Sequence, residues 1–456
     1  MKKILSIILA AVMLAACQQT PKEVKEKYGS SSQQETSAVT AESTPGTPDL
    51  DSEKVDISQL DAYNAKLKDY VKQKEYDNNF TLPENLKINS VSELYNFKMK
   101  QVSGAHEKFP EIYNYCFGRD FKKDSGVDSI NKFTTLGEDE KESPGFYQRH
   151  IYYDYISYID SKGYNKETGY YTTGVYVMGS GFVMYTDNDS YAYDNYELCK
   201  QVYYSKGEQD SEQYLMSDGS QCSPDEAKVY AEKNVNGLLG IINNDFEYKA
   251  RLLHIRRNDE GKHTFSFYMQ KYFKGVPLGD MYIPDFWYES DTHTKWITSD
   301  CFMTGKDKIV GATNNSGLEK LESAEKITGK LIPVTKAVDI MHEKLAEHIK
   351  LDIFNVQLLY LNEYDASDYV KAVQAQSNSG SLDSLSDEQK KLLFSRDRIE
   401  GMEYNCFPVW VFSVASDWKK PNKYGVTDNE NKFSYIIVNA QTGEMKYYTS
   451  IEKKNI

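Results

Sequence analysis

The sequence predicts an α+β protein: a Tyr-rich antiparallel sheet domain, then two modules in which a helix packs on an antiparallel sheet. Tyr, Val and Ile recur at every second position in much of the segment 146–204, which is typical of strands. A capped amphipathic helix is expected from residue 223, and apolar strand-like segments follow it. The same order of a helix and strands returns from residue 332.

The composition limits the classes of protein to consider. The 456 residues include 54 Lys and Arg against 68 Asp and Glu, giving a formal net charge of −14. Such a length suits two or three domains of roughly 100–200 residues. With 40 % apolar and 13 % aromatic residues, the chain is too polar for a multispan membrane protein and too aromatic for a wholly disordered one. Because phosphate binding needs clustered Lys and Arg, we expect no nucleic-acid partner.

The N-terminus has the features of a secretion signal. Met1-Lys2-Lys3 is positively charged, and residues 4–14 form an apolar run that is shorter than the roughly 20 residues of a bilayer-spanning helix. The run ends in Leu14-Ala15-Ala16-Cys17, an aliphatic residue, two small residues and a cysteine. This pattern resembles the lipobox of bacterial lipoprotein precursors. The alternative is an ordinary signal peptide with an accidental cysteine at its cleavage site.

The lipobox resemblance implies a processing route and a location. Residues 1–16 would be removed as the signal peptide, and the Cys17 thiol would receive a diacylglyceryl group. The mature chain would then be anchored by lipid at the extracytoplasmic face of the cell membrane. Residues 18–55 are rich in Ser, Thr, Gln, Glu and Pro, so they bury too little apolar surface to offset their ordering entropy. We therefore predict that 17–55 is the acylated cysteine with a disordered tether.

The first folded domain is predicted at residues 56–220. A helix is expected from Ile57 to about Lys74, because one face gathers residues at helical spacing: Ile57, Leu60, Tyr63 (or Asn64), Leu67, Tyr70 and Val71. The Tyr-rich segment then predicts a meander of antiparallel strands with turns at 168–169 and 179–181. We interpret the Tyr residues as cross-strand pairs in an ordinary sheet. A platform for ligands such as sugar rings is the alternative.

The first helix-on-sheet module is predicted at residues 221–330. Ser223 suits the N-cap, Pro224 the first helical position and Glu226 the third position of a capping box. The helix would bury one apolar face, formed by Ala227, Ala231, Val235 and Leu238. Strands are expected at 246–257 and 263–283, with a turn at 258–261 between them.

The second module is predicted at residues 331–456. Its helix opens near Ile332 and Pro333, and its apolar face is expected to comprise Val334, Val338, Met341, Leu345 and Ile349. A strand follows at 353–364, then a polar excursion at 365–398, then strands within 406–418 and 433–448. The similar spacing from helix to strand in the two modules suggests a duplication.

Three short segments within these modules resemble a known family. They are Tyr272-Phe273-Lys274-Gly275-Val276-Pro277, Phe407-Pro408-Val409-Trp410-Val411-Phe412 and Val438-Asn439-Ala440-Gln441-Thr442-Gly443-Glu444-Met445. Together with the two helices they resemble the PepSY-type module, in which a helix packs on a small antiparallel sheet that ends in a Thr-Gly hairpin. Asn439 stands where the family has Asp. Taken whole, the chain is similar to uncharacterised lipoproteins of Gram-positive bacteria, a resemblance that implies no known activity.

The cysteine and histidine patterns predict no metal site. Without any CxxC, a zinc ribbon and a thioredoxin-like redox motif are both disfavoured. His342 and His348 would lie about 240° apart around a helix, and the calcium-loop-like start at Asp187 lacks the Gly and Glu that such a loop needs. We interpret five cysteines as small buried residues, although one or two disulfides would suit an extracytoplasmic compartment: Cys116, Cys199, Cys222, Cys301 and Cys406.

No catalytic or cofactor-binding constellation is found in the sequence. It has no GxSxG elbow and no glycine-rich nucleotide motif, and its four SxxK matches lack the SDN and KTG partners of penicillin-recognising sites. We assign four tryptophans to core packing rather than to a ligand groove: Trp287, Trp296, Trp410 and Trp418.

The sequence thus predicts a lipid-anchored binding or regulatory protein of the cell envelope, without enzymatic activity or cofactor. Its partners would be the membrane, through the lipid on Cys17, and another envelope protein, through open sheet edges or an aromatic face. The alternative is a cell-wall or glycan-directed hydrolase with dispersed acidic catalytic residues. A solute-binding lipoprotein is disfavoured, because the repeated β-α-β order of such folds is missing.

Overall fold

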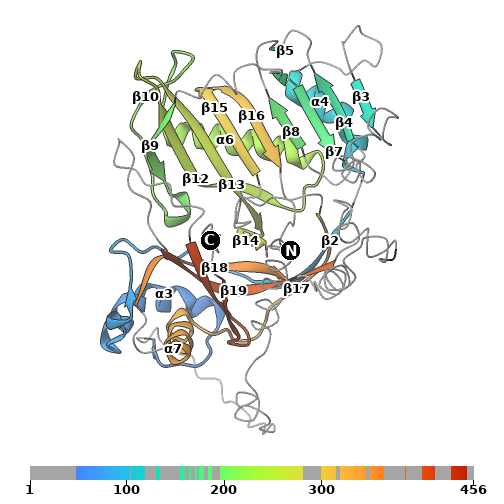
Figure 1. Ribbon diagram of the computed structural model, residues 1–456. Coiled ribbons are helices and arrows are strands. Elements are labelled where there is room, and N and C mark those ends of the chain that lie inside the picture. The colour runs from blue at the N-terminus through green and yellow to red at the C-terminus, as the bar shows by residue number, and fades with distance from the viewer. Residues whose placement is uncertain are drawn as a thin grey trace, which may run out of the picture. The chain divides into compact units, whose positions relative to one another are not determined.

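The computed structural model describes residues 48–102, 104–118, 130–133, 155–159, 164–165, 170–171, 174–178, 183–186, 196–280, 299–314, 319–345, 350–363, 386, 403–415 and 433–448. The chain divides into two units, one of residues 1–48 with 365–398 and the other of residues 49–364 with 399–456. All the helices and strands described here belong to the second unit, and most of its strands form two sheets (Figure 1).

The first sheet, which we call the α6 sheet, is antiparallel throughout its described strands. Its order is β9–β12–β13–β15–β16–β8–β7–β4–β3. The strands are β3 (Ile130–Phe133), β4 (Tyr155–Ile159), β7 (Gly174–Met178), β8 (Val183–Thr186), β9 (Glu197–Val202), β12 (Glu247–Arg257), β13 (His263–Phe273), β15 (Ser299–Gly305) and β16 (Lys308–Asn314). Two short hairpins lie outside this order: β5 (Tyr164–Asn165) with β6 (Tyr170–Tyr171), and β10 (Tyr214–Leu215) with β11 (Gln221–Cys222).

Two helices cover one face of the α6 sheet: α4 (Phe109–Phe117) and α6 (Pro224–Gly240). The capping box predicted for α6 is confirmed, because the Ser223 hydroxyl accepts a hydrogen bond from the Glu226 N–H at 3.2 Å and the Glu226 carboxylate accepts one from the Ser223 N–H at 3.0 Å. The predicted apolar face of α6 is buried against the sheet, in a core that we call the α6 core: it includes Ala227, Ala231, Val235, Leu238, Phe265, Phe267 and Met269.

The second sheet, the α7 sheet, is built around β18 (Leu351–Glu363) and β19 (Glu403–Ala415), which are antiparallel neighbours. β18 also pairs in parallel with β1 (Phe80–Thr81) and β14 (Val276–Asp280). β19 continues to β20 (Phe433–Asn439) and then β21 (Met445–Tyr448), and separately to β2 (Tyr95–Gln101) and then β17 (Glu319–Lys326). β14 also pairs with β13, so it connects the two sheets.

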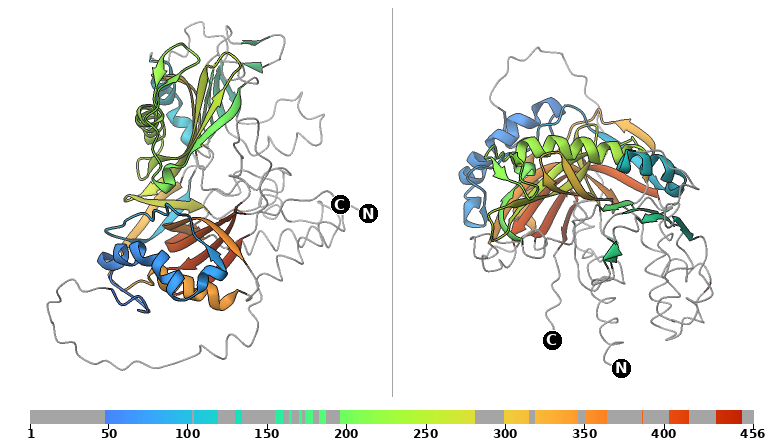
Figure 2. Two further views of the ribbon diagram at one scale, coloured as in Figure 1. Left: turned by 90° about the vertical axis from the view of Figure 1, so that its left-hand side faces the viewer. Right: turned by 90° about the horizontal axis from the view of Figure 1, so that it is seen from above.

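Helices α3 (Leu60–Gln73) and α7 (Val334–Lys344) lie side by side on one face of the α7 sheet (Figures 1 and 2). Together they enclose what we call the α7 core, in which Trp410 is fully buried and donates its indole N–H to the Ile332 carbonyl at 2.8 Å. The predicted core role of Trp410 is therefore confirmed. Trp287, Trp296 and Trp418 lie outside the described residues. Four short 3₁₀ turns complete the described helical structure: 57–59, 76–78, 105–108 and 204–206.

The two sheets repeat one chain order, which confirms the predicted α+β class. Helix α6 is followed by β12, β13, β15 and β16, which are successive antiparallel neighbours apart from the added β14. Helix α7 is followed in the same way by β18, β19, β20 and β21. The predicted left-handed turn residue Gly443 has a φ of 76° in the β20–β21 turn.

Some expectations from the sequence need correction. The predicted α3 face is buried as expected, but α7 ends at Lys344, because Leu345 is extended, with a ψ of 145°. Ile349 lies outside the described residues. The Tyr-rich segment forms a meander only through β4, β7 and β8, since β9 leaves it to pair with β12. Its predicted turns at 168–169 and 179–181 lie outside the described residues.

The predicted boundaries at residues 220 and 330 also do not coincide with the division between the two sheets. β2, from the predicted first domain, and β17, from the predicted first module, both belong to the α7 sheet. Backbone pairing over long sequence distances decides this, and local patterns do not encode it. As limits of independently folding domains, the boundaries remain predictions.

Candidate functional site

The segment Asp49–Val55, which we call the N-terminal strap, joins the predicted tether to the folded unit. Composition predicts that this segment belongs to the disordered tether, but in the structure its backbone is hydrogen-bonded to the folded unit. The Tyr63 hydroxyl donates to the Asp49 carbonyl at 2.9 Å, and the Thr335 hydroxyl donates to the Leu50 carbonyl at 3.0 Å. Val55 and Leu331 exchange two backbone hydrogen bonds of 2.7 and 2.8 Å. The strap is thus fixed to α3 and to the start of α7.

Charged side chains of the strap add a second set of contacts. The Lys74 ammonium lies 2.6 Å from the Asp51 carboxylate, and the Lys336 ammonium lies 2.7 Å from the Glu53 carboxylate. Lys54 donates to the Gln441 carbonyl in the β20–β21 turn at 2.6 Å. The strap therefore contacts the last hairpin of the described chain as well as helices α3 and α7.

A buried tyrosine links the strap to α7. The Tyr70 hydroxyl lies 2.9 Å from both carboxylate oxygens of Asp339 and 3.3 Å from a carboxylate oxygen of Asp51. Burial and the neighbouring Asp339 raise the pKa of Tyr70, and burial raises the pKa of Asp339 against the opposing effect of its tyrosine neighbours. The hydrogen bond from Lys74 lowers the pKa of Asp51. The Asp339 carboxyl group therefore takes up a proton more readily than the neighbouring Asp51 carboxyl group.

An aromatic stack continues this cluster along α7. The His342 ring stacks on Tyr76, with ring centroids 4.0 Å apart, and meets the edge of Phe80. Burial and Asp339 raise the pKa of Tyr76 to about 12. His342, considered in the sequence as a metal ligand, here packs against aromatic rings. His348 lies outside the described residues.

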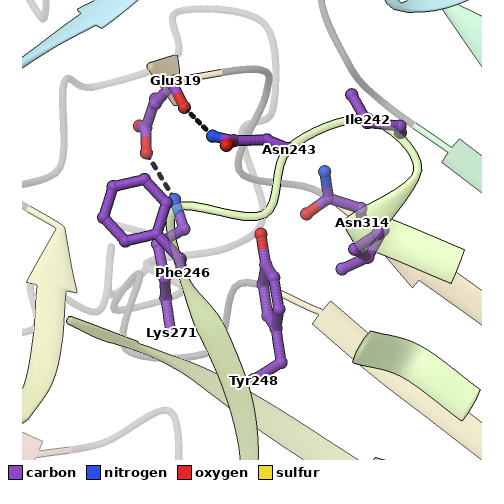
Figure 3. A pocket seen from close by; sticks show the side chains of 8 residues that line it. Ile242, Asn243, Phe246, Tyr248, Lys271, Asn314 and Glu319 are labelled. Carbon is purple, nitrogen blue, oxygen red and sulfur yellow. Dashed lines mark hydrogen bonds and ion pairs between the residues drawn. The ribbon is translucent and has the colours of Figure 1, made fainter. Parts of the chain in front are cut away.

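A second polar site lies where the two sheets meet (Figure 3). Lys271 of β13 forms an ion pair with Glu319, the first residue of β17, and the Asn243 amide donates to the Glu319 carbonyl. Both charged side chains are buried, with 2 % and 4 % exposure. The Lys271 ammonium also lies 5.2 Å from the centre of the Phe246 ring. An ion pair so removed from water requires these close partners.

The cavity beside this ion pair is small. It is lined by Leu239, Ile242, Asn243, Phe246, Tyr248, Lys271, Asn314 and Glu319, and its volume is about 10 Å³. A single water molecule needs about this much space. The cavity therefore suits a bridging water rather than a substrate, and we interpret the ion pair as structural.

The remaining candidates from the sequence have these outcomes. Among the described residues, no group of three or more His, Cys, Asp or Glu side chains is placed to hold a metal ion. The calcium-like loop beginning at Asp187 lies outside them. Five cysteines are free thiols: Cys222, Cys301 and Cys406 are buried, and Cys116 and Cys199 are half-buried. Cys17 lies outside the described residues, as does most of the predicted tether.

Comparison with known families identifies a signal at the N-terminus. Residues 1–18 match the prokaryotic membrane lipoprotein lipid attachment site. The chain is therefore a membrane-anchored lipoprotein by its N-terminal signal. In the described part of the lipoprotein, no helix is long and apolar enough to cross a membrane.

Several solved structures are also similar to the lipoprotein. An uncharacterised protein from Eubacterium rectale ATCC 33656 is similar to it with a TM-score of 0.44 and 12 % sequence identity, over 80 % of this chain and 92 % of that chain. Among curated proteins none matches the sequence.

Sequence reasoning missed both polar sites of the folded unit. Asp339 stands next to the buried Val338 in an ordinary amphipathic pattern, and no motif marks it. Lys271 had a signal, because it alternates in step with the buried Phe267, Met269 and Phe273. That alternation would have placed its side chain inside the protein.

Proposed function

We propose that this lipoprotein is a binding or regulatory protein of the bacterial envelope, fastened at the extracytoplasmic face of the membrane by lipid on Cys17. The match of residues 1–18 to the lipid attachment site is the observation that supports it most. Cys17 is the cysteine that the lipobox pattern designates. Since each buried CH₂ contributes about 0.8 kcal/mol, two or three acyl chains hold a protein stably where one holds it marginally.

We also propose that each helix with its antiparallel strands is a PepSY-like module. The common order of α6 with β12–β16 and of α7 with β18–β21 supports this, since the family places a helix before such a sheet. The turn at Gly443, after Asn439, stands where the family has its Thr-Gly hairpin, and Gly275 occupies the β13–β14 turn with a φ of 80°. The resemblance of the whole chain to uncharacterised lipoproteins implies no known activity, so the proposal concerns recognition rather than catalysis.

The edge strand β17 is the surface we propose for an envelope partner. In the described part of the chain β17 pairs on one side, with β2, and most of its residues are exposed. The Leu321 N–H already donates to the Asp245 carboxylate, so the part of the other side from Glu322 to Lys326 is what can accept the backbone of an added strand. Lys320, Glu322, Glu325 and Lys326 flank this edge, so the fitting partner is an extended peptide with charges of both signs.

A glycan-directed hydrolase is the second candidate, and Asp300 is the group that favours it. Burial raises the pKa of Asp300, and the Thr313 hydroxyl donates to its carboxylate at 2.6 Å. A raised pKa is a property that the general acid of a glycoside hydrolase needs. Asp300 is paired in register with Tyr268, so an aromatic residue for a sugar ring stands on the neighbouring strand.

The anchor is tested by labelling with an alkynyl fatty acid in a bacterial host. The wild-type chain should take up label and partition into detergent, and Cys17→Ser should do neither. Cys199→Ser is the matched control and should behave as wild type, because Cys199 is a half-buried thiol of the folded unit. Equal labelling of wild type and Cys17→Ser contradicts the anchor on Cys17.

Two further measurements distinguish the binding protein from the hydrolase. A photo-crosslinking residue at Lys320 should capture one defined envelope protein, and the same residue at Val229, which is 67 % exposed on α6, should not. Incubation with purified cell walls should release no soluble fragments if the lipoprotein only binds. Release that is abolished by Asp300→Asn but kept by Asp307→Asn would favour the hydrolase instead.

A further inference from the structure

The strap determines where the membrane tether leaves the folded unit. Its backbone is held at Asp49, Leu50 and Val55, and its side chains are held at Asp51, Glu53 and Lys54. Leu50 packs against the α7 core and Val55 is buried in it. Because these contacts run along the whole strap, the tether leaves from a fixed point on the layer formed by α3 and α7.

The length of the tether limits how the unit can turn. Thirty residues, 18–47, separate Cys17 from the first described residue, Pro48. As a random coil they would span about 30 Å. A folded chain of about 400 residues has a radius of gyration of about 22 Å, so a path around half of its surface is roughly 90 Å long. A tether of this length therefore rarely reaches around to the opposite side.

Figures 1 and 2 show which side lies opposite. Figure 1 and the left view of Figure 2 place α3 and α7 at one end of the unit and α6 at the other. We propose that the strap orients the lipoprotein with the α3–α7 layer toward the bilayer and with α6 directed away from it. This inference rests on the proposed anchor at Cys17. It identifies the lipid surface as the neighbour of the α3–α7 layer.

The test uses the acylated full-length lipoprotein in phosphatidylglycerol–phosphatidylcholine vesicles that carry an acceptor dye on their headgroups. A donor dye is attached through an unnatural amino acid at Lys72, exposed on α3, or at Val229, exposed on α6. Energy transfer should be about twofold or more higher from position 72, given the short tether. Equal transfer, or higher transfer from position 229, overturns the orientation.

A tether variant and an anchor variant complete the experiment. Insertion of about 60 Gly and Ser residues between residues 47 and 48 lengthens the tether from 30 to about 90 residues and its random-coil span by about 1.7-fold. The insertion does not touch the strap, and it should reduce the difference in energy transfer between the two positions. An unchanged difference overturns the role of the tether. Sedimentation with the vesicles tests the anchor separately: loss of wild-type sedimentation overturns the anchor and the orientation together, and sedimentation with equal transfer overturns only the orientation.

Discussion

Lys271 and Glu319 form a buried ion pair at the boundary between the cores of the two sheets. On β13, Phe265, Phe267 and Met269 belong to the α6 core and Phe273 belongs to the α7 core. Lys271 lies between these two groups. One strand thus passes from one core into the other, and its only charged residue in that stretch, Lys271, meets the first residue of β17.

Further polar contacts surround this boundary. The Arg251 guanidinium donates to the Gln270 side chain at 3.1 Å and to the Gln357 side chain at 3.2 Å, and Gln357 belongs to β18 of the α7 sheet. The Asp245 carboxylate accepts a hydrogen bond from the Leu321 N–H at 3.1 Å. The contacts between the two sheets therefore include specific polar pairs, which fix one arrangement where apolar side chains alone would tolerate several.

The ion pair gives the first prediction. Lys271→Met leaves the Glu319 carboxylate buried without its cation, so the free energy of unfolding should fall by about 3–5 kcal/mol. The double variant Lys271→Met, Glu319→Leu removes both charges and should recover most of this loss, because Asn243 bonds the backbone of Glu319 and not its side chain. Urea unfolding measures both values.

A surface pair is the control for this experiment. Lys326 and Glu93 lie 2.9 Å apart but are exposed to solvent. Lys326→Met should therefore change stability far less than Lys271→Met. If the two single variants have similar unfolding midpoints, the buried pair has no special role.

The second prediction concerns two glycines of α6. A Cβ atom on Gly237 would lie 2.1 Å from the Tyr115 hydroxyl, whereas Gly240 has nothing within 4 Å of such an atom. Gly240→Ala should stabilise the protein by up to about 1 kcal/mol, the difference in helix propensity. Gly237→Ala should gain less, because it displaces Tyr115 and breaks the hydrogen bond from its hydroxyl to the Asn234 carbonyl.

A double-variant cycle checks this explanation. In a Tyr115→Ala background nothing opposes the new methyl group, so Gly237→Ala should stabilise α6 about as much as Gly240→Ala does. Thermal unfolding of the four chains gives the coupling between positions 115 and 237. A Gly237→Ala effect that is the same in both backgrounds contradicts the contact.

Local features of the sequence were sufficient to predict α3, α6, the start of α7 and many of the strands, but they did not predict α4. Ser223, Pro224 and Glu226 define the start of α6 without help from the rest of the chain, and the alternation in β13 defines its inward face. The turn at Gly443 could likewise be predicted from the residues of that turn alone. In each case the determining interactions lie within a few residues.

Long-range pairing explains what could not be predicted. β9 could have continued the meander, but it pairs with β12, and β2 joins β19 from more than 300 residues away. The strap has a disordered-type composition, and contacts with residues outside it make it part of the unit: Tyr63, Lys74, Thr335 and Lys336 contribute through their side chains and Leu331 through its backbone. Asp339 acquires its environment in the same way, from Tyr70 on a different helix.

The third prediction concerns the thiols. Burial raises the pKa of Cys222 to about 11 and that of Cys116 to about 12, and it raises the pKa of Cys301. Because the thiolate is the reactive form, Ellman's reagent should react slowly with the native lipoprotein at pH 8. In urea without reductant, five thiols should react, the five that are free in the structure. Fewer than five would indicate disulfides, and a sixth would indicate that Cys17 carries no lipid.

The last prediction is a pH dependence at the α3–α7 layer. Burial raises the pKa of Asp339 in the folded protein above its ordinary value of 3.8. A carboxyl group with a raised pKa contributes stability that is fully present below the ordinary value and is lost as the pH rises through the raised one. Asp339→Asn cannot ionise, yet its amide oxygen can still accept the Tyr70 hydroxyl.

The difference in the free energy of unfolding, wild type minus Asp339→Asn, should therefore decrease as the pH rises from about 4 to 7. Asp51 has the opposite dependence, since Lys74 lowers its pKa and its contribution is lost as the pH falls. Asp51, Lys74 and Lys336 are present in both chains, so their titration largely cancels from the difference. Urea unfolding at a series of pH values measures it, and a difference that is constant or increases with pH would show that Asp339 is not held in the environment described here.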